Sequence, residues 1–191
     1  MRNKITFVGR SNVGKSSTIK ALTGAKLKVG RRPGITLEPM EIPYGGAVVL
    51  DMPGFGFMMG ISKKKQEEVK NFIVRYLENS GDVLFAVQVT DAKAFVSIAL
   101  RWLSRGHVPL EVEMYQFLRE VNLEPLLVAN KMDKIPLEKR SEVLDEICSL
   151  LNLEGPWTNC NIIPFSARTG EGLPELKKAL RVKLNRHINT L

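Results

Sequence analysis

A glycine-rich loop that ends in a lysine and a serine lies near the start of the chain, between a short apolar run and a helix-forming segment. It reads G-x-x-x-x-G-K-S from Gly9 to Ser16 and follows the run Ile5–Val8. Glycines allow successive backbone N–H groups to converge on a phosphate, and the following helix adds the positive end of its dipole. Lys15 would contact the β- and γ-phosphates, and the Ser16 hydroxyl would bind Mg²⁺. The residues expected around the phosphates are Gly9, Arg10, Ser11, Asn12, Val13, Gly14, Lys15, Ser16 and Ser17.

A second motif indicates which base is bound. Asn130-Lys131-Met132-Asp133 directly follows the apolar run Pro125–Ala129. The Asp133 carboxylate can accept hydrogen bonds from guanine N1–H and from the exocyclic amine, whereas adenine presents an unprotonated N1 and no such amine. Lys131 can lie over the base, and Asn130 can tie this loop to the phosphate loop. N-K-x-D alone is common, but in this context it predicts guanine nucleotides, GTP and GDP, rather than ATP.

Two further segments are expected to act on the metal and on the γ-phosphate. Asp51-Met52-Pro53-Gly54 ends the apolar run Ala47–Leu50. This places Asp51 near Mg²⁺ through a water, and the Gly54 N–H near the γ-phosphate. Thr36, in an irregular stretch, is the expected second hydroxyl ligand when GTP is bound. The predicted metal residues are therefore Ser16, Thr36 and Asp51, and the predicted catalytic residues are Lys15, Thr36 and Gly54.

The remaining nucleotide contacts are expected from loop residues. Ser166-Ala167-Arg168 follows the apolar run Ile162–Phe165 and would present backbone N–H groups to guanine O6. The nucleotide-contacting residues not yet named are Gly34, Ile35, Pro53, Ser166, Ala167 and Arg168. Each of these residues is common in loops, so taken alone it could equally be a plain turn residue with no role in nucleotide binding. Their order along the chain, each after a strand-like run, favours the nucleotide site.

The predicted reaction is in-line attack of water on the γ-phosphate, with Mg²⁺ and Lys15 stabilising the developing charge. Phe55 directly follows the D-x-x-G segment, where many G domains carry a glutamine that orients the water. We therefore expect slow intrinsic turnover that depends on a cation or a partner, although Phe55 could also simply pack. Asn12 could hold K⁺ beside the phosphates or, alternatively, hydrogen-bond the loop backbone. Arg31 and Arg32 could supply charge, or contact RNA or solvent.

Apolar runs alternate with helix-period stretches along the chain, which predicts an α/β fold. The runs are short and continuous, as in strands covered on both faces, and Pro39–Ile42 would add a hairpin strand through Tyr44–Gly46. The expected helices are Lys15–Leu22, Lys65–Asn79, Ala94–Gly106, Glu111–Asn122, Leu137–Leu151 and Leu173–His187. The prediction is one Ras-like P-loop GTPase domain over residues 1–191, with a mostly parallel six-stranded sheet and helices on both faces.

The charge balance suggests a polyanionic partner. Lys and Arg number 28 against 20 Asp and Glu, a formal net charge of +8. Lys63–Lys65 and the basic face of Leu173–His187 could contact RNA phosphates, although a solvated face or a solubility role is the alternative. No apolar run is long enough to span a bilayer, and Cys148 and Cys160 lack metal-ligand spacing. We therefore expect a cytoplasmic monomer with reduced thiols.

The motifs together resemble the EngB family of GTP-binding proteins over essentially the whole chain. The resemblance rests on Gly9–Ser17, Pro33–Thr36, Asp51–Gly56 and Asn130–Asp133. It implies a cytoplasmic GTPase that helps to assemble the large ribosomal subunit. The segment 94–113 is longer than in bacterial members, which suggests an archaeal-type version. The alternatives are a nucleotide-gated RNA- or ribosome-binding module with negligible hydrolysis, and a G domain that serves another RNA-related process.

Overall fold

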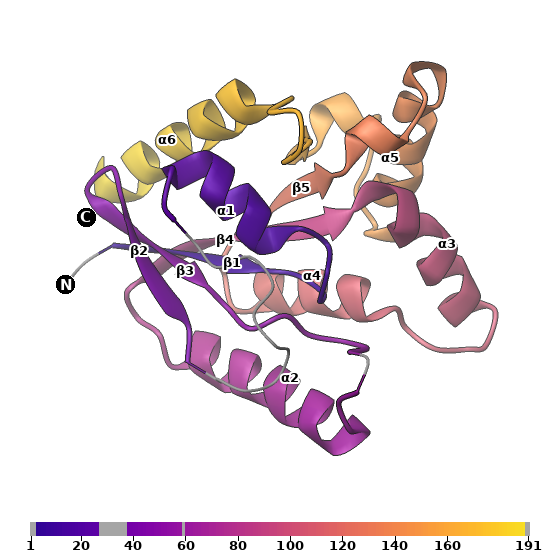
Figure 1. The fold of residues 1–191 in the computed structure, drawn as a ribbon, viewed down its shortest axis with the longest axis horizontal. Coiled ribbons are helices and arrows are strands. Elements are labelled where there is room, and N and C mark those ends of the chain that lie inside the picture. The colour runs from indigo at the N-terminus through magenta and orange to yellow at the C-terminus, as the bar shows by residue number, and fades with distance from the viewer. Residues whose placement is uncertain (1–2, 27–37, 59, 190–191) are drawn as a thin grey trace.

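The computed structural model describes residues 3–26, 38–58 and 60–189, and builds them around one twisted sheet (Figure 1). The strand order is β2-β3-β1-β4-β5-β6, and every neighbouring pair is parallel except β2 and β3. The strands are β1 (Lys4–Val8), β2 (Met40–Tyr44), β3 (Ala47–Asp51), β4 (Val83–Asp91), β5 (Leu126–Asn130) and β6 (Ile162–Pro164). The predicted α/β fold with a mostly parallel six-stranded sheet is confirmed.

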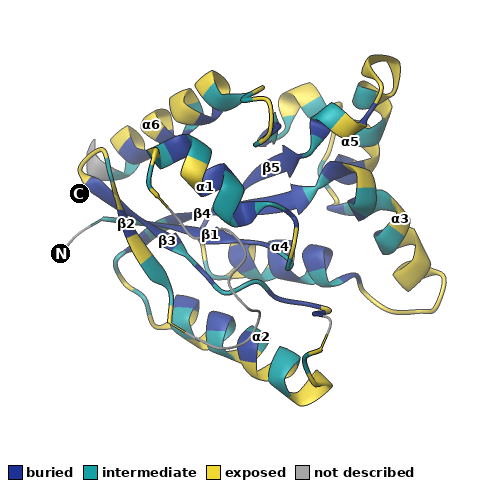
Figure 2. Cartoon of the chain, viewed as in Figure 1, coloured by how far each residue is buried: buried dark blue, intermediate teal, exposed yellow. Residues whose placement is uncertain are grey.

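Helices cover both faces of this sheet because its strands are apolar on both sides. The helices are α1 (Lys15–Thr23), α2 (Lys63–Glu78), α3 (Ala92–Leu103), α4 (Leu110–Glu120), α5 (Arg140–Leu150) and α6 (Leu173–Asn189). Along β5, Leu126 and Val128 pack with α1 and α6, whereas Leu127 and Ala129 pack with α3 and α5. Successive side chains of a strand point to opposite faces, so a continuous apolar run yields two cores. Figure 2 shows the buried strands between helices whose outer faces are exposed.

The β2–β3 hairpin turns through Gly45 and Gly46, whose φ angles are +51° and +84°. A two-residue turn that matches the twist of the flanking strands needs a positive φ at both of its central residues. Glycine adopts such angles without strain. Tyr44 pairs with Ala47 across this turn. The hairpin is therefore present as predicted, with β2 ending at Tyr44 rather than at Ile42.

Helices α2 and α3 each start two residues before their predicted first residue because side chains cap them. Helix α2 begins at Lys63, two residues before its predicted start, since the Ser62 hydroxyl accepts a hydrogen bond from the Lys65 N–H at 3.3 Å. Helix α3 begins at Ala92 because Asp91 accepts from the Ala94 N–H at 3.2 Å. Both are N-cap contacts, which satisfy otherwise unpaired amides of the first turn. In the described ranges, no helix combines the length and the apolar character needed to cross a bilayer.

Candidate functional site

The phosphate loop joins β1 to α1 and packs directly against the carboxyl ends of neighbouring strands. Gly14 caps α1 with φ +95°, and a Cβ placed there would lie 2.2 Å from Asn130 Nδ2. A Cβ on Gly9 would lie 2.5 Å from the Val89 carbonyl oxygen. Both glycines are thus required by close packing, and Gly14 also by its backbone angle. The loop lies at the carboxyl edge of the sheet, where open α/β sheets bind ligands.

The predicted phosphate and metal residues meet at this edge. The Lys15 ammonium donates to the Asp51 carboxylate and to the Met52 carbonyl, and the Ser16 hydroxyl donates to Asp51 Oδ2 at 2.8 Å. Only 8% of the Lys15 side chain and 10% of the Asp51 side chain are exposed. A triphosphate would draw Lys15 away from Asp51, because a phosphate offers the buried cation a stronger anionic partner.

The same oxygen atoms suit a magnesium ion. Mg²⁺ prefers oxygen ligands and is usually held by one or two protein groups together with substrate phosphates and waters. Ser16 Oγ and the Asp51 carboxylate provide such a pair. Among residues 3–26, 38–58 and 60–189 there is no group of three or more His, Cys, Asp or Glu side chains able to hold a metal without a nucleotide. The predicted residues Gly34, Ile35 and Thr36, and also Arg31 and Arg32, lie outside the described residues.

The segment after Asp51 runs beside the phosphate loop. The Ser11 N–H donates to the Phe55 carbonyl at 2.9 Å, and the Phe55 N–H donates to the Gly9 carbonyl at 3.3 Å. A Cβ on Gly54 would lie 3.1 Å from Ser11 Cα, so a larger residue would push the two segments apart. The Phe55 ring is only 2% exposed and packs among Val8, Leu50 and Met52. The alternative that Phe55 simply packs is confirmed, and no side chain at this position can orient water.

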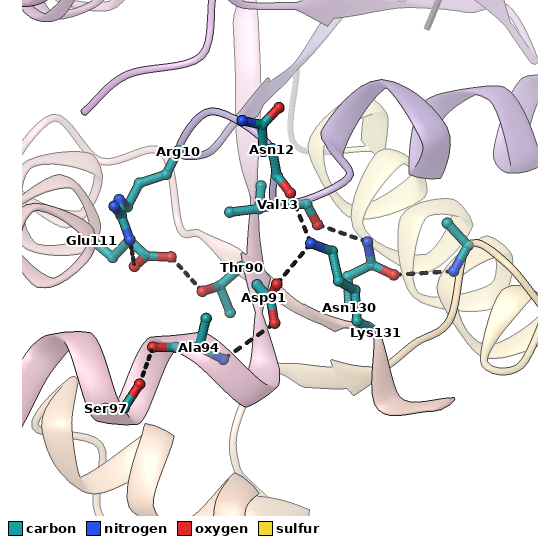
Figure 3. Close-up of polar contacts among 11 residues, drawn as sticks. Arg10, Asn12, Val13, Thr90, Asp91, Ala94, Ser97, Glu111, Asn130 and Lys131 are labelled. Carbon is teal, nitrogen blue, oxygen red and sulfur yellow. Dashed lines mark hydrogen bonds and ion pairs between the residues drawn. The ribbon is translucent and has the colours of Figure 1, made fainter. Parts of the chain in front are cut away.

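The base-recognition segment is joined to the phosphate loop by side chains. Asn130 Nδ2 donates to the Val13 carbonyl at 2.8 Å, and Asn130 Oδ1 accepts from the Ala167 N–H at 3.0 Å. Lys131 Nζ donates to the Asn12 carbonyl at 2.8 Å and to Asp91 Oδ2 at 2.7 Å (Figure 3). These contacts join the loops that follow β1, β5 and β6, and so fix their positions relative to one another.

The Asp133 carboxylate is held in place by two neighbouring side chains. Ser166 Oγ donates to Asp133 Oδ1 at 2.6 Å, and Arg168 Nε donates to Asp133 Oδ2 at 2.8 Å. The bond from Ser166, aided by Arg168, lowers the pKa of the Asp133 carboxyl against the opposing effect of burial. The carboxylate is therefore ionised near neutral pH, the state that can accept from guanine N1–H and the amine.

In the loop of Ser166, Ala167 and Arg168, the backbone N–H groups predicted to face guanine O6 make hydrogen bonds within the protein. The Ser166 N–H donates to the Glu171 carbonyl at 3.0 Å, and the Ala167 N–H is already bonded to Asn130. Guanine O6 would have to compete with these internal acceptors for the two N–H groups. Sequence reasoning assigned backbone roles here, whereas the structure shows side-chain contacts from Ser166 and Arg168 to Asp133.

Sequence reasoning missed a buried acid behind the phosphate loop. Glu111, in the first turn of α4, is 3% exposed, accepts from the Thr90 hydroxyl and lies 3.4 Å from Arg10 Nη1 (Figure 3). Burial raises the pKa of Glu111, and the contacts with Thr90 and Arg10 oppose that rise. The Arg10 side chain, predicted to contact the nucleotide, is thus paired with Glu111. The available signal was the spacing of Glu111 from Met114, Tyr115 and Leu118, which puts this acid on the apolar face of the helix.

Comparisons with known proteins agree with this geometry. Residues 4–131 match a family model described as 50S ribosome-binding GTPase. The chain is 48% identical over 188 residues to a probable GTP-binding protein EngB from the archaeon Methanopyrus kandleri, with 96% of this chain and 93% of that protein covered. It is also similar to a crystal structure of a probable GTP-binding protein engB, with a TM-score of 0.86, 40% identity, and 96% and 99% of the two chains covered.

A more distant structure contains bound RNA. The chain is similar to Era, solved in complex with MgGDPNP and a segment of 16S ribosomal RNA, with a TM-score of 0.65 and 25% identity. The superposition covers 93% of this chain and 55% of that one.

Proposed function

This chain belongs to the EngB family of GTP-binding proteins, and from that membership we propose that it hydrolyses GTP as a switch in large ribosomal subunit assembly. The resemblance drawn from the motifs, including the archaeal type, is confirmed by the relatives. The observation that carries the proposal is that the phosphate loop and the base-recognition segment are joined to each other at the carboxyl edge of the sheet. Lys15, Ser16 and Asp51 meet at its phosphate end, and an ionised Asp133 lies at its base end.

In the proposed reaction, water attacks the γ-phosphorus and the bond to the β-phosphate oxygen breaks, which yields GDP, phosphate and a proton. Lys15 would move from Asp51 to the β- and γ-phosphates and stabilise the charge that develops there. Ser16, Thr36 and, through water, Asp51 would hold Mg²⁺, which supplies further positive charge at the phosphate oxygens. The Gly54 N–H would bind a γ-phosphate oxygen. The buried, apolar Phe55 ring cannot orient the water, so we expect a partner or a cation to assist.

The proposed ribosomal partner is supported by the family description, by charge and by a relative. Era, with a similar fold, was solved with ribosomal RNA, and this chain carries a formal net charge of +8. Cationic patches provide a sequence-independent attraction to RNA phosphates. A role in subunit assembly would place the protein in the cytoplasm, and a monomer would suffice for it.

Single-turnover hydrolysis would separate a catalytic switch from a binding module that merely responds to nucleotide. The rate of GTP cleavage should be measured with and without purified large ribosomal subunits, at saturating Mg²⁺. The proposal predicts slow cleavage by the free protein and acceleration by the subunits. A rate that stays negligible in both conditions would instead support a nucleotide-gated RNA-binding module.

We predict that Lys63, Lys64 and Lys65 contact RNA phosphates. They occupy the first turn of α2, which contains no acidic residue, and only Lys65 has an ion pair among the described residues, with Glu68 at 3.0 Å. Cations at the positive end of a helix dipole reduce helix stability, so a binding role would explain them. Replacing all three by Glu should weaken subunit association without changing GTP affinity. The slope of log affinity against log salt should become shallower by about two to three.

The charge reversal at the start of α2 can be compared with a matched reversal elsewhere on the surface. Acidic residues in the first turn complement the helix dipole, so the triple variant should not be less stable. Reversing the exposed Lys20, Lys93 and Lys139 makes the same change in net charge elsewhere. Equal losses in the two triple variants would show that only net charge matters, and would contradict a site at the start of α2.

We further predict that K⁺ accelerates hydrolysis more than Na⁺. The Asn12 side chain is exposed and makes no hydrogen bond within the described ranges, so its carbonyl is available to a cation. A K⁺ ion beside the phosphates would supply the charge that Phe55 cannot help to organise. Turnover should be about tenfold faster in K⁺ at equal ionic strength, with subunits present, and Asn12→Ala should remove the difference. Equal rates in both salts would leave Asn12 a structural residue.

A further inference from the structure

A groove of about 440 Å³ lies between the tip of the β2–β3 hairpin and α6. It is at the edge of the sheet where β1 and β3 begin, opposite the edge that carries the nucleotide site. Figure 1 shows the hairpin tip beside the last part of α6. The groove is lined by, among others, Tyr44, Ala47, Lys177, Lys178, Arg181 and Leu184.

The hollow follows from the small residues beside Tyr44. The cross-strand partner of Tyr44 is Ala47, and the two residues between them are glycines. A Cβ on Gly45 or Gly46 would meet no atom within 4 Å. Tyr44 packs against the core that contains α1 and α6, so its half-buried ring is on the α6 side of the sheet. The ring therefore borders the groove, and toward the hairpin tip its neighbours are the small residues Gly45, Gly46 and Ala47.

The opposite wall is strongly basic. Lys177, Lys178 and Arg181 are exposed, and in the part of the chain that the structure describes none of them has an ion pair. Among the residues that the structure describes, no Asp or Glu lines the groove. Other lysines here are neutralised: on the same helix, Lys183 contacts Glu124 at 3.1 Å. Like charges three and four residues apart on one helix repel each other, so an anionic ligand would stabilise this wall.

We propose that this groove binds one unpaired nucleotide of an RNA strand, a site that rests on the ribosomal role proposed above. The cations would hold the phosphates on either side of that nucleotide, and its base would lie against the Tyr44 ring over the apolar floor at Leu184. Aromatic stacking combined with basic side chains is the usual way to bind single-stranded RNA. A paired base is not available to the ring, so the groove selects single strands. Its volume is in the range of small-ligand sites.

The test compares a labelled octauridine with a blunt RNA duplex of equal phosphate number by fluorescence anisotropy, in the absence of ribosomal subunits. The wild-type protein should bind the single strand more tightly. Tyr44→Leu should weaken single-strand binding about tenfold and leave duplex binding unchanged. Trp102→Leu, which removes an exposed aromatic ring on α3, is the matched control and should change neither. Arg181→Gln should weaken both and reduce the salt dependence.

A second measurement needs no variant. Photocrosslinking of wild-type protein to RNA containing 4-thiouridine should label the peptide that contains Tyr44. Unchanged single-strand affinity in Tyr44→Leu, or label only elsewhere, would overturn the proposal. Displacement of the RNA by millimolar inorganic phosphate would overturn it too, since that would indicate a site for a simple anion.

These outcomes are separate from those for the ribosomal role. If octauridine binding depends on Tyr44 but large subunits never bind in any nucleotide state, the RNA groove stands and the ribosomal role fails. If the subunits bind in the GTP state but Tyr44→Leu changes nothing, the ribosomal role stands and the groove proposal fails.

Discussion

Lys15→Ala is expected to lose nearly all binding of Mg²⁺-GTP and, with it, hydrolysis. The ammonium is 8% exposed and lies at the end of the phosphate loop, in contact with Asp51 and Met52. Charge-assisted hydrogen bonds contribute roughly 1.5–3 kcal/mol each, so loss of the two expected to the β- and γ-phosphates predicts at least about a hundredfold weaker binding. Calorimetric titration with GTP and GDP would measure the change. GDP, which lacks the γ-phosphate, should lose less affinity than GTP.

The same substitution leaves Asp51 without its buried cation, so stability must be measured alongside. Removing one partner of a buried ion pair costs roughly 3–5 kcal/mol, and thermal unfolding would reveal it. Lys15→Met retains most of the side-chain volume and distinguishes loss of charge from a cavity. Lys20→Ala, at an exposed position of α1, should bind GTP normally. Full GTP affinity in a folded Lys15→Met variant would disprove the phosphate-loop assignment.

Asp133→Asn is expected to exchange guanine preference for xanthine preference. The asparagine amide would present a donor where guanine also presents one, whereas xanthine has a C2 carbonyl that can accept from it. Charged hydrogen bonds of this kind predict a loss of GTP affinity of about tenfold to a hundredfold, with a gain for XTP of similar size. Competition of GTP, XTP and ATP against a fluorescent guanine nucleotide would measure all three affinities.

The control for this exchange is Glu138→Gln, which makes the same change in charge at an exposed position nearby. It should leave the preference for GTP intact. Ser166 donates one hydrogen bond to Asp133 and leaves the carboxylate itself in place when replaced, so Ser166→Ala should weaken GTP binding less than Asp133→Asn does. An Asp133→Asn variant that kept full GTP affinity and gained none for XTP would show that the base lies elsewhere.

The sequence predicted the sheet well because most of its strands are short apolar runs, and β3, β4 and β5 each end in Asp or Asn. Asp51 and Asn130 each end a strand, and both lie at the edge where the phosphate loop begins. A parallel sheet brings such positions together whatever their separation along the chain. The sequence therefore placed Ser16 and Asp51 at one metal site and joined Asn130 to the phosphate loop. It did not predict the direct hydrogen bonds from Ser16 to Asp51 and from Asn130 to the Val13 carbonyl.

The unpredicted contacts depend on packing rather than on spacing. Glu111 and Arg10 are separated by 101 positions and meet only because α4 begins beside the phosphate loop. Asp91 both caps α3 and pairs with Lys131, and nothing in its neighbours along the chain indicates the second contact. The start of α2 was placed two residues late because Ser62 caps it from outside the charged run. The groove beside Tyr44 likewise exists only where the hairpin meets α6.

Cosedimentation with purified large ribosomal subunits would show whether this protein binds them in a GTP-dependent way. The protein should be mixed with the subunits in GDP, in GTP and in a non-hydrolysable GTP analogue, over a series of salt concentrations. We expect retention with the analogue, release with GDP, and retention that falls as salt rises. Equal binding in all three nucleotide states, or no binding with the analogue even at low salt, would contradict it.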